Sequence, residues 1–276
     1  METILEKIIA YKRKETEERK SLYPVKLLER SLYFQAQPVS LEKYLLREDL
    51  SGVIAEFKRR SPSKGTINAY AKPAEVTLAY MQAGASALSV LTDEHFFGGA
   101  AKDLEEARRV NYCPVLRKDF IVDEYQVIEA KSIGADAILL IAAVLSKEEI
   151  KNLSALAFSL GMEVLLELHD ETETARMTGD IRLAGINNRN LADFSVNVER
   201  SFEMAEKLGS GFTLVSESGI SDPATAANLY DAGFRGFLIG ESFMRTAQPG
   251  KTCSAFVSQF RELREKNKIN NSVISS

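Results

Sequence analysis

Short apolar runs recur along the chain and alternate with longer amphipathic stretches. The runs read GVIAEFK, ALSVLT, PVLRKDF, AILLIAA, MEVLLELH, LAGINN, TLVSES and GFLIG, from residue 52 to residue 240. Neighbouring runs are spaced by roughly 20 to 35 residues, the length of one strand plus one helix. Because eight such units close into a barrel of about 250 residues, the pattern predicts a single (β/α)8 TIM barrel of the α/β class.

Glycines and capping residues mark the ends of the helices expected between the runs. A helix often ends at a residue in the left-handed conformation, which glycine adopts most readily. Five glycines stand where a helix would end before the next run: Gly84, Gly134, Gly161, Gly209 and Gly233. The runs are largely apolar on both faces, which favours parallel strands covered by helices over an antiparallel sheet with one wet face.

Two helix starts carry recognisable signals. Ser146 followed by Glu149 predicts a capping box. Asp222 followed by Pro223 predicts an N-cap with proline at the first helical position. Both signals stand just before stretches where the repeat requires a helix.

The chain divides into three predicted segments. Residues 1–50 lie outside the repeat, and their charged helical pattern, with Ile4 and Ile8 near one stripe, predicts a helical extension packed over one mouth of the barrel. Residues 51–266 make the barrel. The last stretch, 267–276, reads NKINNSVISS and predicts a flexible tail.

Composition and charge narrow the class of protein. At 276 residues, with 45% hydrophobic and 27% charged residues, the chain has the composition of a globular domain with a substantial core. Its formal net charge of -4 gives no general attraction to nucleic acid or to anionic lipid. We therefore expect neither a nucleic acid nor a membrane as a partner.

Cysteine usage and the N-terminal segment indicate the compartment. Cys113 and Cys253 have no CxxC spacing and no nearby histidine, which predicts reduced thiols and no zinc site. The segment METILEKIIAYKRKETEERK lacks the continuous apolar core of a signal peptide, and no run is long enough to span a bilayer. We expect a cytoplasmic protein.

Charged residues stand at the carboxyl ends of the predicted strands, where a TIM barrel gathers its catalytic loops. In EFKRRSPSKG, Glu56 and Lys58 share one face because side chains alternate along a strand. Later strand ends carry further polar side chains: Lys118, Glu167, Asn187, Arg189, Glu217 and Ser218. One such residue is usually a solvated loop residue, whereas several lysines and glutamates in one mouth shift one another's pKa values and can supply acid and base roles.

The loops SESGI and IGESF follow the seventh and eighth runs, where phosphate-binding TIM barrels present backbone amides to the ligand. Gly219 and Gly240 allow a close approach of the backbone, and Ser242 adds a donor. The alternative is that these glycines only form tight turns. His95 and His169 lie in or beside loops, and we expect both to be solvated.

Six segments together, EFKRRSPSKG, LRKDF, LLELH, GINNRNL, SESGI and IGESFM, resemble the indole-3-glycerol phosphate synthase family. The resemblance runs across nearly the whole chain, including the N-terminal helices that this family adds to its barrel. Two mild departures are Phe57, where tyrosine is frequent, and Asn190, where aspartate is common. Neither falls on a charged position.

The resemblance implies a phosphorylated small-molecule substrate, 1-(2-carboxyphenylamino)-1-deoxyribulose 5-phosphate. It implies conversion to indole-3-glycerol phosphate with loss of carbon dioxide and water, in tryptophan biosynthesis. Lys118 would be the acid that protonates the ketone oxygen as the ring carbon attacks. Ring closure leaves an iminium that serves as the electron sink for decarboxylation, so neither a cofactor nor a metal is required.

The resemblance also implies the roles of the other site residues. Catalytic positions fall on Lys118, Glu167, Glu56, Lys58 and Asn187, and the division of the dehydration steps among Glu167, Glu56 and Lys58 stays open. Substrate-binding positions fall on Ser61, Arg189, Phe97, Phe120, Glu217 and Ser218. Phosphate-binding positions fall on Lys58, Gly219, Gly240 and Ser242. Phe97 and Phe120 would flank the aromatic ring, unless they belong to ordinary core packing.

Two other function classes remain to be separated from this one. A class I aldolase would also use a barrel lysine, but as a Schiff-base nucleophile that borohydride would trap. A nucleic-acid binder would explain the cations of KRRSPSK, would bind with steep salt dependence, and would leave the glutamates unexplained. For the quaternary structure we expect a monomer or a weak homo-oligomer.

Overall fold

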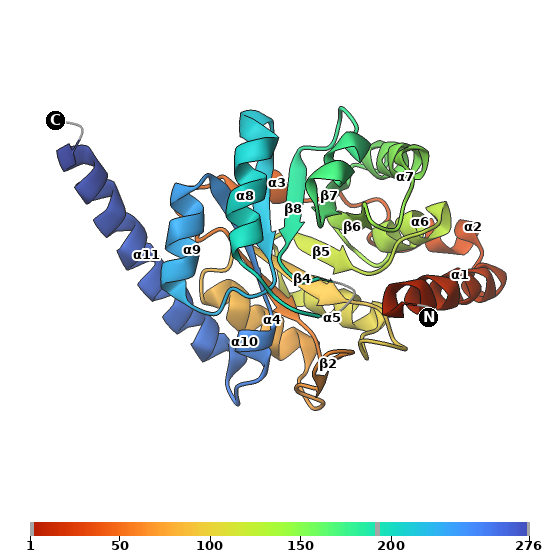
Figure 1. Cartoon of the computed structure of the whole chain (residues 1–276). Coiled ribbons are helices and arrows are strands. Elements are labelled where there is room, and N and C mark those ends of the chain that lie inside the picture. Colours follow the sequence, from red (N-terminus) through yellow and green to blue (C-terminus); the bar gives the residue numbers. More distant parts are fainter. Residues whose placement is uncertain (1–2, 191–193, 275–276) are drawn as a thin grey trace.

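The computed structural model describes residues 3–190 and 194–274, and its elements are labelled in Figure 1. Eight parallel strands close into a barrel in the order β1-β10-β9-β8-β7-β6-β5-β4, and β4 pairs with β1. These strands are β1 (Val53–Phe57), β4 (Ala87–Leu91), β5 (Val115–Lys118), β6 (Ala137–Ile141), β7 (Glu163–Leu168), β8 (Leu183–Asn187), β9 (Thr213–Glu217) and β10 (Phe234–Ile239). The predicted TIM barrel is confirmed, and only β10 begins before its predicted run, at Phe234 instead of Gly236.

Helices surround the barrel, and most of them connect successive strands (Figure 1). They are α4 (Pro73–Gln82), α5 (Ala101–Val110), α6 (Glu124–Ser132), α7 (Lys147–Ser159), α8 (Glu199–Leu208), α9 (Pro223–Asp231), α10 (Glu241–Met244) and α11 (Pro249–Ile274). Helices α10 and α11 follow the last strand, β10. The connection from β7 to β8 differs from the repeat because it holds the 3-10 helix η1 (Glu171–Arg176) in place of an α-helix. A second 3-10 turn, η2 (Gly209–Gly211), follows α8.

The predicted helix boundaries are confirmed. All five predicted helix-ending glycines have positive φ, between 65° at Gly209 and 103° at Gly233. Ser146 and Glu149 form the capping box of α7, and the Asp222 side chain accepts a hydrogen bond from the backbone N–H of Ala224 at the start of α9. Local sequence signals therefore mark where these helices begin or end.

The N-terminal extension contacts both ends of the barrel, whereas the sequence placed it over one mouth. Helix α3 (Leu41–Leu45) buries Leu41 and Leu45 among the barrel-filling residues near the strand starts. Helix α1 (Ile4–Leu22), followed by α2 (Val25–Leu28), packs on the outside against α6 (Figure 1). The first turn of α1 reaches the opposite mouth, where the strands end.

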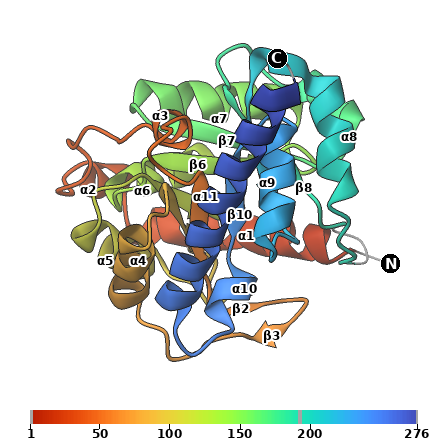
Figure 2. The same ribbon diagram turned by 90° about the vertical axis from the view of Figure 1, so that its left-hand side faces the viewer.

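Two further segments complete the chain. A hairpin of β2 (Arg60–Ser61) and β3 (Gly65–Thr66) rises from the loop after β1 and lies beside α10 (Figure 2). Helix α11 continues to Ile274, so residues 267–274 are helical where the sequence predicted a tail; the flexibility of that segment stays a prediction, and 275–276 lie outside the described residues. Within the described ranges, no helix combines the length and apolar character needed to cross a membrane.

The barrel interior is apolar near the strand starts and polar near the strand ends. Ile54, Leu116, Leu165 and Val215 belong to one buried apolar cluster inside the barrel. Two residues further along each strand, alternation brings the next side chain to the same inner face. That step changes the lining from hydrocarbon to charge, and it locates the candidate site.

Candidate active site

A cavity of about 530 Å³ opens at the carboxyl ends of the barrel strands. Every site residue predicted from the sequence lines it: Glu56, Lys58, Ser61, Phe97, Lys118, Phe120, Glu167, Asn187, Arg189, Glu217, Ser218, Gly219, Gly240 and Ser242. The structure therefore brings the predicted set together, and the role of each residue stays a prediction.

Lys118 stands at the end of β5 between two glutamates. Its Nζ lies 3.2 Å from Glu167 Oε2 and 3.7 Å from Glu217 Oε2. Burial alone would lower the pKa of Lys118, but the charges of the neighbouring glutamates outweigh burial and raise that pKa. The ammonium form of Lys118 is therefore favoured at neutral pH.

The two glutamates around Lys118 differ in charge state. Burial would raise the pKa of Glu167, but the charge of Lys118 and a hydrogen bond from Asn187 Nδ2 (3.1 Å) help to hold that pKa below its usual value. For Glu217, burial and repulsion from Glu167 raise the pKa well above the usual value. The pKa values of the two glutamates are thus shifted in opposite directions beside a shared ammonium, which is the pattern that separates acid from base roles.

Space for the Glu217 side chain depends on a glycine of the neighbouring strand. A Cβ atom on Gly185 of β8 would lie 2.2 Å from Glu217 Oε1. That oxygen is buried and has no hydrogen-bond partner among the described residues. Gly185 was not predicted as part of the site, because only the register between β8 and β9 shows this approach.

A second ion pair lies across the mouth at the end of β1. Lys58 Nζ is 2.8 Å from Glu56 Oε1, and the two side chains are 16% and 5% exposed. A Cβ on Gly240 would lie 2.6 Å from the same Glu56 oxygen. Gly240 therefore makes room for the side chain of Glu56.

The loops after β9 and β10 form a polar rim around the cavity. Ser218 and Gly219 both have positive φ, at 67° and 80°. Ser242 has a buried Oγ with no hydrogen-bond partner among the described residues, so a donor is available at this rim. Arg245, which the sequence reading missed, is exposed and also lines the cavity. Its position after α10 in IGESFMR was the available signal.

Aromatic and aliphatic side chains form one wall of the cavity. The rings of Phe97 and Phe120 have centroids 5.9 Å apart and are tilted by 40°. Both rings are partly exposed to the cavity, which favours a binding surface over simple core packing. Ile4 and Ile8 of α1 line the same cavity, and their apolar stripe in the sequence was the signal for this contact.

The two histidines have different surroundings. His95 is exposed, as expected, and stacks on Tyr11 at 4.2 Å between ring centroids. The expectation of a solvated His169 was wrong, because its side chain is 10% exposed and its Nε2 lies 3.3 Å from Glu167 Oε1. Burial would lower the pKa of His169, but the nearby carboxylates of Glu173 (Oε2 3.8 Å from Nδ1) and Glu167 raise that pKa.

Neither the cysteines nor a cluster of metal-binding side chains contributes to the cavity among the described residues. Cys113 and Cys253 are free and buried away from it. Across residues 3–190 and 194–274, no group of three or more His, Cys, Asp or Glu side chains is placed to hold a metal ion. The polar groups at the mouth are arranged as ion pairs between lysines and glutamates.

Comparison with known proteins identifies a family whose members resemble this chain in sequence. The family described as Indole-3-glycerol phosphate synthase matches residues 5–256. A protein of that name from Bacteroides thetaiotaomicron is 51% identical over 257 residues, covering 93% of this chain and 98% of the relative. Another from Neisseria meningitidis serogroup B is 46% identical over 250 residues, covering 89% and 95%. The solved tryptophan synthase subunit alpha from Legionella pneumophila is 14% identical with a TM-score of 0.57, over 82% of this chain and 98% of that chain, and supports the fold alone.

Proposed function

Because the chain belongs to the indole-3-glycerol phosphate synthase family, we propose that the cavity at its barrel mouth closes and aromatises the indole ring. The chain is a carboxy-lyase of tryptophan biosynthesis. The observation that carries the assignment of the site is the Lys118 ammonium, held between Glu167 and Glu217 inside that cavity.

Lys118 acts first, as the general acid. The ring carbon bearing the carboxylate forms a carbon–carbon bond to the ketone carbon, and the ketone oxygen takes a proton from the Lys118 ammonium. The nitrogen of the ring system becomes an iminium. Loss of carbon dioxide then returns the electrons of the broken carbon–carbon bond to that iminium, so the substrate itself is the electron sink.

Glu167 acts next, as the base. Burial alone would raise the pKa of Glu167, but the charge of Lys118 contributes most to lowering it below its usual value. Once Lys118 has given up its proton, that attraction is gone and the pKa of Glu167 rises, so the carboxylate becomes a stronger base at the stage when a proton must be removed. Asn187 keeps the carboxylate oriented through its hydrogen bond to Oε1.

Dehydration also needs an acid on the departing hydroxyl. Lys58 is available for this step because its ammonium lies at the other side of the mouth, 2.8 Å from Glu56 Oε1. The hydroxyl leaves as water with the proton of Lys58, while a base takes the proton whose loss makes the ring aromatic. This division gives each lysine one acid step.

The phosphate lies at the rim formed by the loops after β9 and β10. Gly219 and Gly240 leave the backbone accessible there, and Ser242 offers its unpartnered Oγ. Lys58 and Arg245 supply positive charge, which a phosphate dianion requires. Arg189, Ser61 and the aromatic pair are left to hold the anthranilate part. Cytoplasmic location and a monomeric or weakly oligomeric state stay predictions.

Replacement of Lys118 tests the assignment of the acid. We expect Lys118→Ala to lower turnover by about 10²-fold or more, which is the usual contribution of one general acid. The exposed Lys151 of α7 provides the matched control, Lys151→Ala, which should turn over normally. Borohydride added during turnover should leave the enzyme unmodified. Full activity of Lys118→Ala, or a reduced Schiff base on Lys118, would contradict this mechanism and favour an aldolase-type nucleophile.

A further inference from the structure

Helix α1 carries a buried lysine that the proposed reaction does not use. Lys12 is 2% exposed, and its Nζ lies 2.6 Å from Glu15 Oε2, 2.8 Å from Asp93 Oδ2 and 3.1 Å from Asp119 Oδ1. A lysine is seldom buried to this extent unless it is paired. Burial would lower the pKa of Lys12, but Asp119 and Asp93 outweigh burial and raise it, so the ammonium persists.

Asp93 connects this ammonium to the loop after β4. Its Oδ1 accepts hydrogen bonds from the backbone N–H groups of Phe96 (2.7 Å) and Phe97 (3.1 Å). The ring of Tyr11, one residue before Lys12, packs on the edge of Phe96 with centroids 5.7 Å apart. Helix α1 therefore fixes both the backbone and the outer side of the loop that carries Phe97.

Asp119 connects the same ammonium to the loop after β5. Its Oδ1 accepts the backbone N–H of Phe120 at 2.8 Å, and its Oδ2 accepts from Thr92 Oγ1 at 2.6 Å. Gln126 Nε2 donates to the carbonyl oxygen of Phe120 at 2.9 Å. Both the N–H and the carbonyl group of Phe120 are thus held by hydrogen bonds. The N–H bonds to Asp119, which also contacts Lys12.

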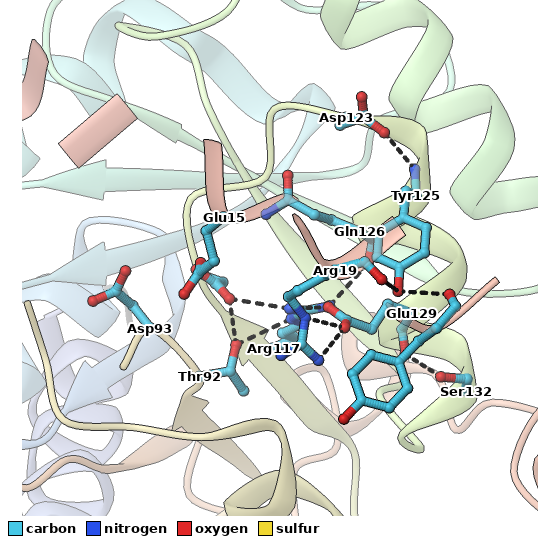
Figure 3. A network of polar contacts seen from close by, with 12 residues as sticks. Glu15, Arg19, Thr92, Asp93, Arg117, Asp123, Tyr125, Gln126, Glu129 and Ser132 are labelled. Atoms are coloured by element: carbon cyan, nitrogen blue, oxygen red, sulfur yellow. Dashed lines mark hydrogen bonds and ion pairs between the residues drawn. The ribbon is translucent and has the colours of Figure 1, made fainter. Parts of the chain in front are cut away.

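A wider buried network supports these two loops (Figure 3). Arg117, which is 4% exposed, donates to Thr92 Oγ1 at 3.0 Å and to Glu129 Oε2 at 2.7 Å. Arg19, also from α1, approaches the other oxygen of Glu129, with its Nε at 2.7 Å. The network joins α1, β5 and α6, and Lys12 is the member that touches both loop carboxylates.

We propose that Lys12 is a positioning residue that sets the spacing of Phe97 and Phe120 by neutralising Asp93 and Asp119 together. The inference rests on the proposed function, because the two rings are taken to receive the aromatic part of the substrate. Without the ammonium, Asp119 keeps Arg117, whose Nη2 lies 3.1 Å from its Oδ2, but the buried Asp93 loses the cation that now lies 2.8 Å from its Oδ2. Asp93 then faces the charge of Asp119 unscreened, and movement of the loops that carry the two carboxylates relieves this repulsion. Movement of either loop changes the distance between the ring centroids, which is 5.9 Å in the structure.

Lys12→Met tests the proposal, because methionine keeps the length of the side chain and removes its charge. We expect the KM for the carboxyphenylamino substrate to rise about tenfold while kcat changes by less than about threefold, since the rings contact the substrate in ground and transition states alike. Lys12→Arg, which keeps the charge, should recover part of the KM. Lys14→Met is the matched control, because Lys14 lies on the same helix with a side chain that is 77% exposed, and its KM should not change.

A double-mutant cycle separates positioning from general destabilisation. In a background that lacks both rings, Phe97→Ala with Phe120→Ala, Lys12→Met should raise KM by no more than about a further twofold, because the rings whose spacing it sets are already gone. Undiminished effects in that background would overturn the proposal, as would a lower melting temperature with an unchanged KM. If Lys12→Met does not fold, Lys12→Met is combined with Asp93→Asn, which removes the repulsion between the two carboxylates; KM should then return to within about threefold of the wild-type value, and a tenfold rise in this variant would overturn the proposal. Failure of the proposed function itself would be distinct, since wild-type enzyme would then show no turnover.

Discussion

At the scale of single residues, the main feature is the difference between two glutamates around one lysine. Glu167 and Glu217 both contact Lys118, but only Glu167 also accepts a hydrogen bond from Asn187. The pKa of Glu167 is lowered, while burial and the charge of Glu167 raise the pKa of Glu217 well above its usual value. The negative charge is therefore favoured on Glu167 over Glu217, because Asn187 and Lys118 stabilise the Glu167 carboxylate.

This asymmetry predicts different outcomes for two otherwise identical substitutions. Glu167→Gln removes a charge that the reaction uses, and we expect turnover to fall by about 10²-fold or more. The pKa of Glu217 is raised, which favours its protonated form, and Glu217→Gln resembles that form, so we expect a loss of less than about tenfold. Steady-state kcat at pH 7 measures both, with circular dichroism as the check on folding. Equal losses in the two variants would show that Glu217 works as an anion.

At the scale of elements, the site depends on how neighbouring strands approach each other. Gly185 of β8 leaves the space into which Glu217 of β9 projects. We expect Gly185→Ala to displace the Glu217 carboxyl from Lys118 and to destabilise the fold by about 1–3 kcal/mol, as overpacking usually does. Denaturant unfolding of Gly185→Ala, Glu217→Ala and the double variant tests this. The double variant should be more stable than the sum of single effects predicts, and strict additivity would mean that the two residues do not meet.

At the same scale, some site residues could be predicted from the sequence and others could not. The position at a predicted strand end was enough to select Glu56, Lys118, Glu167 and Glu217, because the carboxyl ends of barrel strands meet at one mouth. The sequence could not place Gly185 or Lys12, since their contacts depend on strand register and on helix docking. His169 was misjudged for a related reason: being next to a loop does not expose a side chain that packs against Glu167.

At the scale of the whole molecule, the N-terminal extension links the two ends of the barrel. Helix α3 fills the end where the strands start, while α1 supplies Ile4 and Ile8 to the cavity at the other end. Lys12 adds a charge contact to the same end. The extension is thus part of the site's wall as well as a cover for the barrel.

The composition of the whole chain offers a direct assay of the complete reaction. The protein contains no tryptophan and nine tyrosines, so its own emission is weak at the wavelengths where an indole emits. Adding the carboxyphenylamino substrate at catalytic enzyme levels should produce tryptophan-like emission that grows in proportion to the carbon dioxide released. Exhaustive chelation beforehand should leave both signals unchanged, because the iminium supplies the electron sink. Carbon dioxide without indole emission would mean that the enzyme decarboxylates without completing the ring, and recovery only on adding metal would show that the sink lies elsewhere.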